Sequence, residues 1–167
     1  IMKYLKTFFP ILIIPILIIL FIFKTASSHD TIDFKPLLLL EKEKPNTSKK
    51  RLNHMFTFSL RCSALLNSLG KEMENGKLIT ISRNFNQSAY VSLLLIKKKN
   101  AEVLRQQVAD YINKFIKIYT PILKNNYTKN KKHIEGSDIL EGDYQACKKF
   151  SSKTNSFLRA NGFQVLK

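Results

Sequence analysis

The stretch LNHMFTFSLRCSALLNSLGKEM, residues 52–73, decides the fold that the sequence predicts. Its apolar side chains recur at steps of three and four residues, which places them on one face of an α-helix. These side chains are Leu52, Met55, Phe58, Cys62, Leu65, Leu69 and Met73. We therefore expect an amphipathic helix over about 53–74, with Asn53 as a candidate cap and with Gly70 and Gly76 as candidate stops.

A second helical stripe follows downstream, and its length leaves two interpretations open. It consists of Phe85, Ala89, Leu93 and Ile96, followed by Leu104, Val108, Tyr111, Phe115, Ile118 and Ile122. Its two halves are roughly in phase, so one long helix over about 86–119 and two shorter helices both agree with the pattern. Thr120–Pro121 predicts an end or a kink, because proline disfavours helical geometry in the residue before it. We expect loops at 77–83 and at 124–136.

The last helical pattern begins at Ser137, a good N-cap residue, and Asn161–Gly162 is a plausible stop. Its inward stripe is Leu140, Tyr144, Cys147, Phe150, Thr154, and Phe157 or Leu158. Together the patterns predict an all-α protein, in which residues 52–167 form a small antiparallel bundle of three to four helices.

An apolar N-terminal run precedes this domain. Residues 7–23, TFFPILIIPILIILFIF, carry no charge and follow Lys3 and Lys6. A span of a bilayer needs about 20 apolar residues, whereas the apolar region of a cleaved signal has about 7–15. With 17 residues the run fits either a retained transmembrane anchor or a signal peptide removed after Ser28. Both interpretations make residues 1–28 a membrane-targeting segment and predict that the downstream domain lies outside the cytoplasm, in the periplasm or the exterior.

Residues 29–51 resemble a charged flexible linker, because they contain prolines, a Glu/Lys alternation and the cluster Lys49–Lys50–Arg51. Such a composition buries too little apolar area to offset the ordering of its backbone. The exception is the run Leu37–Leu40, for which docking on the domain and contact with the membrane surface are the two alternatives.

The two cysteines of the chain, Cys62 and Cys147, fall in the inward stripes of two predicted helices. An even cysteine count in an exported protein favours a disulfide, and neighbouring helices provide the short Cα separation that a bridge requires. A bridge across such a loop contributes roughly 4–5 kcal/mol by the chain-entropy relation. Two buried free thiols are the alternative.

The formal net charge of +16 does not predict a nucleic-acid partner. Lysines far outnumber the five arginines, although Arg is the residue that reads base edges and binds phosphate through two parallel bonds. An exported domain also rarely meets nucleic acid. The favoured interpretation is a solvated basic surface with no dedicated partner. The alternatives are attraction to anionic lipid or to a cell-envelope polymer, and an unknown protein partner, beside the membrane contact of residues 7–23.

No other residues form a recognisable catalytic or metal site, and we expect no cofactor. His54 and His133 lack further ligands at metal spacing, and Arg61 is interpreted as a solvated flank of Cys62. Helix capping and dipole effects account for the carboxylates near helix ends, Asp138, Glu141 and Asp143. A solvated face accounts for Glu72 and Glu74.

The sequence thus favours a non-enzymatic, disulfide-linked helical domain that mediates contacts in the cell envelope. The alternative is a lipid or small apolar ligand binding protein, for which we would expect a cavity lined by Phe85, Leu93, Tyr111 and Phe115. An enzyme would instead require a pocket with converging polar groups around His54 or His133.

Overall fold

The computed structural model describes residues 34, 36–42, 45–97 and 100–167, and within these ranges every regular element is an α-helix. The helices are α2 (Leu37–Glu41), α3 (Ser48–Glu72), α4 (Gly76–Lys97), α5 (Ala101–Asn130) and α6 (Asp138–Ala160). The all-α prediction is therefore confirmed for this part of the chain. The apolar run 7–23 lies outside the described residues, and none of the described helices is long and apolar enough to cross a membrane.

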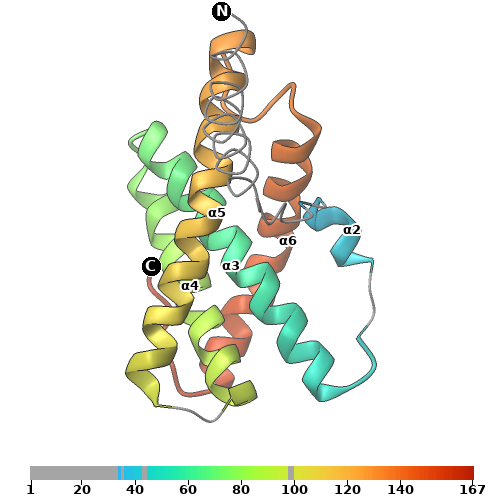
Figure 1. The fold of residues 1–167 in the computed structure, drawn as a ribbon, viewed down its shortest axis with the longest axis vertical. Helices are drawn as coiled ribbons and strands as arrows, with labels where there is room; N and C mark the ends of the chain where they lie inside the picture. The colour runs from blue at the N-terminus through green and yellow to red at the C-terminus, as the bar shows by residue number, and fades with distance from the viewer. Residues whose placement is uncertain (1–33, 35, 43–44, 98–99) are drawn as a thin grey trace, which may run out of the picture. The chain divides into compact units, whose positions relative to one another are not determined.

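Helix α3 is the centre of the bundle. It contacts α4, α5 and α6, and an unbroken stretch of it from Phe58 to Leu66 is buried. Consecutive long helices run in opposite directions, as the ribbon shows (Figure 1). This arrangement is the predicted antiparallel bundle, and the helices from residue 35 onward form one compact unit.

The turn between α3 and α4 depends on Gly70. A Cβ atom at this position would lie 2.8 Å from Cγ1 of Ile79 on α4, so the missing side chain allows the two helices to approach. The last turn of α3 closes with hydrogen bonds from the amides of Asn75 and Glu74 to the carbonyls of Gly70 and Lys71, at 2.7 and 3.3 Å. Glu74 adopts a left-handed conformation, with φ of 50°, at the position where such turns usually carry glycine.

The predicted loop at 77–83 is wrong, because α4 begins at Gly76. Apolar and polar residues alternate weakly in KLITISR, residues 77–83, and this pattern is typical of an extended segment. The side chain of Asn75 accepts the amide of Leu78 at 3.2 Å, which satisfies a free donor in the first turn and starts a helix.

The open question of one or two helices is resolved in favour of two. Helix α4 ends at Lys97 and α5 begins at Ala101, where the side chain of Asn100 accepts the amide of Glu102 at 2.8 Å. The capping residue thus starts a new helix although the apolar stripe continues in phase.

An end at Thr120–Pro121, one of the two outcomes predicted there, is wrong, and so is the first half of the loop expected at 124–136. The helix continues through Pro121 and ends only at Asn130, so it takes in half of the loop expected at 124–136. Proline in a helix costs about 3 kcal/mol. Tyr119 and Leu123 are fully buried on either side of it, and burial of side chains of this size offsets that cost.

The boundaries of α6 agree with the sequence. Ser137 occupies the N-cap position, although its side chain makes no capping hydrogen bond there. At the other end, Gly162 has φ of 79°, and its amide and that of Phe163 bond to the carbonyls of Arg159 and Leu158 at 3.0 and 2.9 Å. This pattern is a Schellman motif, the stop that the Asn-Gly pair predicted.

Within the predicted linker of 29–51 the structure has α2 and the first residues of α3, which begins at Ser48. Helix α2 contacts α6, and Leu37 is fully buried. The leucine run therefore docks on the domain, which was one of its two alternatives. Leu38 and Leu39 remain 40% and 50% exposed.

Candidate functional site: a cysteine pair beside a buried ion pair

The structure brings the two predicted site residues, Cys62 and Cys147, together between α3 and α6. Their sulfur atoms lie 2.05 Å apart, which is disulfide distance, and their Cα atoms are separated by 5.5 Å. Both side chains are buried in the core. A bond between them closes a loop with a sequence separation of 85 residues, for which the chain-entropy relation gives about 4.6 kcal/mol of stabilisation.

A buried ion pair joins the same two helices next to the cysteines. The guanidinium of Arg61 donates from Nη2 to Oδ2 of Asp143 at 2.6 Å, and the two side chains are only 4% and 0% exposed. Arg61 directly precedes Cys62 on α3, and Asp143 lies one helical turn before Cys147 on α6. The cysteine pair and the ion pair therefore lie side by side between the same two helices.

Tyr119 brings a third helix, α5, into this cluster. Its hydroxyl donates to Oδ2 of Asp143 at 2.5 Å and accepts a hydrogen bond from Nε of Arg61 at 3.2 Å. Burial raises the pKa of the Tyr119 hydroxyl far above its usual value, and the neighbouring carboxylate acts in the same direction. The phenol thus stays protonated and remains a donor to Asp143.

Asp143 also holds α2. Its Oδ1 accepts the backbone amide of Leu37 at 2.6 Å, a donor in the first turn of α2 that has no partner within the helix. At the other end of α2, Nε2 of His54 donates to the carbonyl of Leu40 at 2.9 Å. Side chains from α6 and α3 therefore fix both ends of this five-residue helix.

The prediction that Arg61 is a solvated flank is wrong, and so is the helix-dipole interpretation of Asp143. Every residue of α3 from Phe58 to Leu66 is buried, including those beside the inward stripe. Arg61 is one of these residues and is only 4% exposed. The sequence carried one signal. Asp143 precedes Cys147 by four residues, so both lie on the inward face of α6. Asp143 also lies beyond the first turn of α6, and the helix dipole acts on charges within the first turn.

The other carboxylates agree better with the sequence. Glu141 accepts the amide of Gly136 at 2.6 Å and thereby supports the start of α6. Glu72 is part of a solvated ion pair, with Oε1 at 3.7 Å from Nζ of Lys124.

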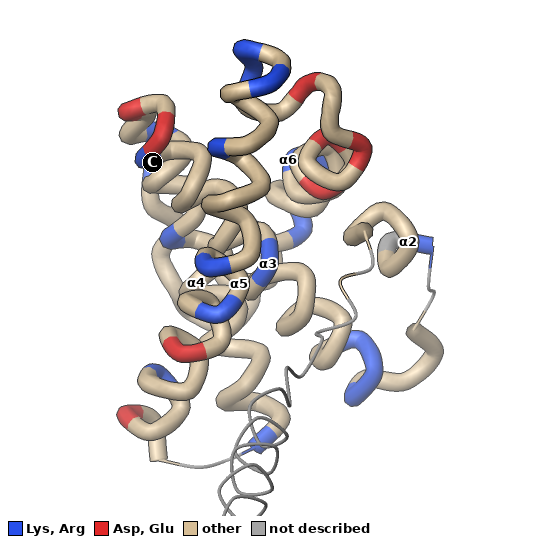
Figure 2. The backbone as a smooth tube through the Cα atoms, turned by 45° about the horizontal axis from the view of Figure 1, so that its top comes forward, with Lys and Arg blue, Asp and Glu red and all other residues tan. Residues whose placement is uncertain are grey.

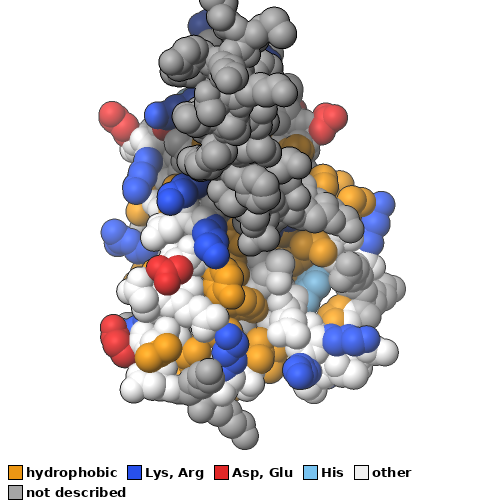
Figure 3. Space-filling view, viewed as in Figure 1, with side chains coloured by type: hydrophobic (Ala, Val, Ile, Leu, Met, Phe, Trp, Pro, Cys, Tyr) orange, Lys and Arg blue, Asp and Glu red, His pale blue; other side chains and the backbone are white. Residues whose placement is uncertain are grey.

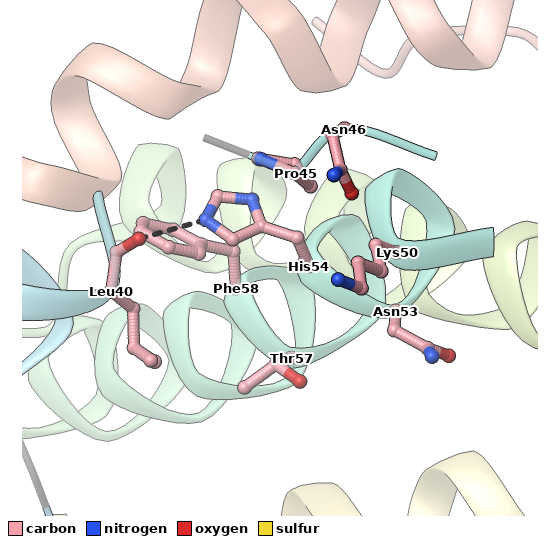
Figure 4. Close-up of a pocket in the computed structure, with 8 residues that line it drawn as sticks. All are labelled: Leu40, Pro45, Asn46, Lys50, Asn53, His54, Thr57 and Phe58. Carbon is pink, nitrogen blue, oxygen red and sulfur yellow. Dashed lines mark hydrogen bonds between the residues drawn. The ribbon is translucent and has the colours of Figure 1, made fainter. Parts of the chain in front are cut away.

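A cavity of about 440 Å³ opens beside His54, between α2 and the N-terminal part of α3. Its lining consists of Leu40, Pro45, Asn46, Lys50, Asn53, His54, Thr57 and Phe58 (Figure 4). The lining includes the hydroxyl of Thr57 and the amine of Lys50, but neither forms a hydrogen bond with His54 among the described residues. The ring of His54 packs at 4.7 Å from that of Phe58, and its Nε2 is occupied by Leu40. In this arrangement His54 holds the C-terminal end of α2 against α3.

The remaining candidates stay apart. His133 stacks on Tyr127 at 4.5 Å, and no group of three metal-ligating side chains is found in the described part of the chain. Phe85 and Leu93, expected around a lipid cavity, are packed in the core. The described basic residues of the helices are spread over α3, α4, α5 and α6 (Figure 2), and basic, polar and hydrophobic side chains are interspersed in the visible part of the face in Figure 3.

Comparison with known proteins adds no relative to these observations. No protein-family model matches the chain, and neither a curated protein nor a solved structure matches it. The functional argument therefore depends on the contacts and the chemistry of the chain's own residues.

Proposed function

We propose that this protein is a non-enzymatic helical domain of the cell envelope, held at the membrane or secreted by its N-terminal apolar segment and stabilised by a Cys62–Cys147 disulfide. The observation that carries the proposal is the pair of buried cysteines at disulfide distance in a chain that also contains the uncharged apolar run 7–23. Disulfides persist in oxidising compartments and are rare in the cytosol, so the pair and the run favour the same location.

We further propose that the domain makes contacts in the cell envelope, and the position of α2 supports this role. This helix is docked by Leu37 and turns Leu38 and Leu39 toward solvent, shortly after the apolar run in the sequence. Exposed leucines on a docked helix are a suitable contact for the bilayer surface or for another envelope protein. The basic cluster Lys49–Lys50–Arg51 at the start of α3 would add attraction to anionic headgroups.

Fractionation of cells, with sequencing of the mature N-terminus, tests the location. Recovery from washed membranes with Lys3 still present would support the anchor. Recovery from the soluble exterior fraction with a mature chain that starts at His29 would support the cleaved signal. Both results agree with export, whereas full-length chain in the cytosol would contradict it.

Replacement of both Leu38 and Leu39 by serine tests the contact role, with Val103→Ser on α5 as the control, since Val103 is 60% exposed. We expect cross-linking of the full chain to envelope components to decrease for the α2 variant only. Equal cross-linking by the parent and both variants would show that α2 is not the contact surface.

A further inference from the structure

A second cavity lies on another part of the bundle, between α4, α5 and the C-terminal segment. Its volume is about 430 Å³, within the range of about 300–1,000 Å³ typical of small-molecule sites. The lining residues are Arg83, Asn86, Gln87, Tyr90, Arg105, Val108, Ala109, Phe163 and Leu166. All of them are described residues, and they come from three separate segments of the chain.

One wall of this cavity is held by a buried amide. Asn84 on α4 donates from Nδ2 to the carbonyl of Leu166 and accepts the amide of Leu166 at Oδ1, both at 2.9 Å. Asn84 is only 4% exposed, so the two part-buried bonds tie the exposed Leu166 to a residue of the core. The double contact fixes the backbone of the C-terminal segment, whereas the side chain of Leu166 remains 45% exposed at the cavity.

The charged part of the lining is purely basic. Two of the five arginines of the chain, Arg83 and Arg105, line the cavity, and no carboxylate is among its lining residues. In the part of the chain that the structure describes, neither forms an ion pair. The guanidinium of Arg105 lies 5.2 Å from the ring centre of Tyr90, a cation–π contact that orients it.

This combination specifies a ligand class. A guanidinium matches the planar or tetrahedral arrangement of oxygens in a carboxylate or phosphate and binds it through two parallel hydrogen bonds. The side-chain amides of Asn86 and Gln87 offer further donors. On the apolar side, Phe163 and Leu166 provide a surface on which a short hydrocarbon chain would lose contact with water.

We propose that this cavity binds a small anionic amphiphile, with its carboxylate or phosphate held by Arg83 and Arg105 and its apolar part packed against Phe163 and Leu166. This site is independent of the proposed contact role of α2. It differs also from the cavity expected around Phe85 and Leu93, because its ligand is recognised by charge as well as by apolar surface.

Isothermal titration of the full chain at low salt, below the micelle concentration of each probe, tests the proposal. Octyl phosphate and octanoate carry both parts of the ligand, whereas inorganic phosphate and octanol carry the head or the tail alone. We expect one molecule of octyl phosphate or octanoate to bind per chain. Inorganic phosphate and octanol should each bind at least about tenfold more weakly, because each lacks one set of contacts.

Variants separate the two parts of the site. Arg83→Gln and Arg105→Gln should each weaken octyl phosphate binding by about tenfold, which is the usual effect of losing a charged hydrogen bond. Arg159→Gln removes the same charge from an exposed position on α6 that is not among the lining residues and should leave binding unchanged. Leu166→Ala should weaken octyl phosphate by about threefold and leave inorganic phosphate unaffected, because it removes only apolar contact. Leu166 is half exposed, so its replacement should not unfold the domain.

Three results would overturn the proposal. The first is the absence of saturable binding by either amphiphile. The second is an equal loss of affinity for Arg159→Gln and for the two cavity variants, which would indicate general attraction to a basic protein. The third is equal binding of octyl phosphate and one of the partial probes. Equality with phosphate would identify a bare anion site, and equality with octanol would identify apolar adsorption.

Discussion

Replacement of Asp143 by asparagine is the sharpest test of the cluster between α3 and α6. The change keeps the size of the side chain and removes its charge. Asp143 accepts hydrogen bonds from Leu37, Arg61 and Tyr119, at 2.6, 2.6 and 2.5 Å. An asparagine has one acceptor oxygen, so its NH₂ group must face at least one of these donors, and the Arg61 cation stays buried without its counter-charge.

The expected loss follows from this burial. Breaking a buried ion pair from one side costs about 3–5 kcal/mol, which for a domain of this size corresponds to a decrease in Tm of about 10–15 °C. Urea unfolding followed by circular dichroism measures the free energy of unfolding of Asp143→Asn. Glu72→Gln is the matched control, because the pair of Glu72 and Lys124 is 29% and 63% exposed. It should change stability by less than about 1 kcal/mol.

A second substitution separates charge from packing. Arg61→Met in the Asp143→Asn background removes the unpaired cation and should recover about 2 kcal/mol, a coupling typical of contacting residues. If Asp143→Asn unfolds within about 1 kcal/mol of the parent chain, or if Glu72→Gln costs as much, the buried pair does not hold these helices as described.

Three further substitutions test the backbone and the buried phenol. Gly70→Ala should destabilise the domain by about 1–3 kcal/mol in urea unfolding, because the new methyl group meets α4 at 2.8 Å; an unchanged midpoint would contradict the close approach. Glu74→Gly should raise Tm, since it relieves a left-handed conformation that costs about 1 kcal/mol, and a lower Tm would argue against that turn. The raised pKa of Tyr119 means that the folded state holds the phenolic proton more tightly than the unfolded state. The protonated phenol therefore contributes its full stabilisation below pH 10, and this contribution decreases as the pH rises above 10. Tyr119→Phe should flatten the decline of stability between pH 10 and 11.5. Parallel declines for the parent chain and the variant would refute this.

Much of the fold could be predicted because burial follows the helical period. The stripes around Cys62 and Cys147 indicated α3 and α6, and the same stripes placed the two cysteines on inward faces. The stop at Asn161–Gly162 was equally local, since it depends on one residue with freedom at positive φ. These features depend on residues that are close in the sequence, so they can be predicted from one sequence alone.

The ion pair could not be predicted in the same way. A buried polar residue has no period of its own, and Arg61 and Asp143 are acceptable in the core only because a residue 82 positions away supplies the opposite charge. The helix through Pro121 was missed for a related reason. The local preference of proline opposed it, whereas the burial of Tyr119 and Leu123 depends on the whole bundle.

Trapping of thiols in intact cells tests most directly whether Cys62 and Cys147 are joined in the compartment where the domain resides. Cells that produce the full chain are quenched in acid, denatured, and treated with a maleimide of high mass, with and without prior reduction. The disulfide predicts no mass shift before reduction and two additions after it, whereas Cys62→Ala should gain one addition in both conditions. Two additions without reduction would contradict the bridge and the oxidising location that depends on it.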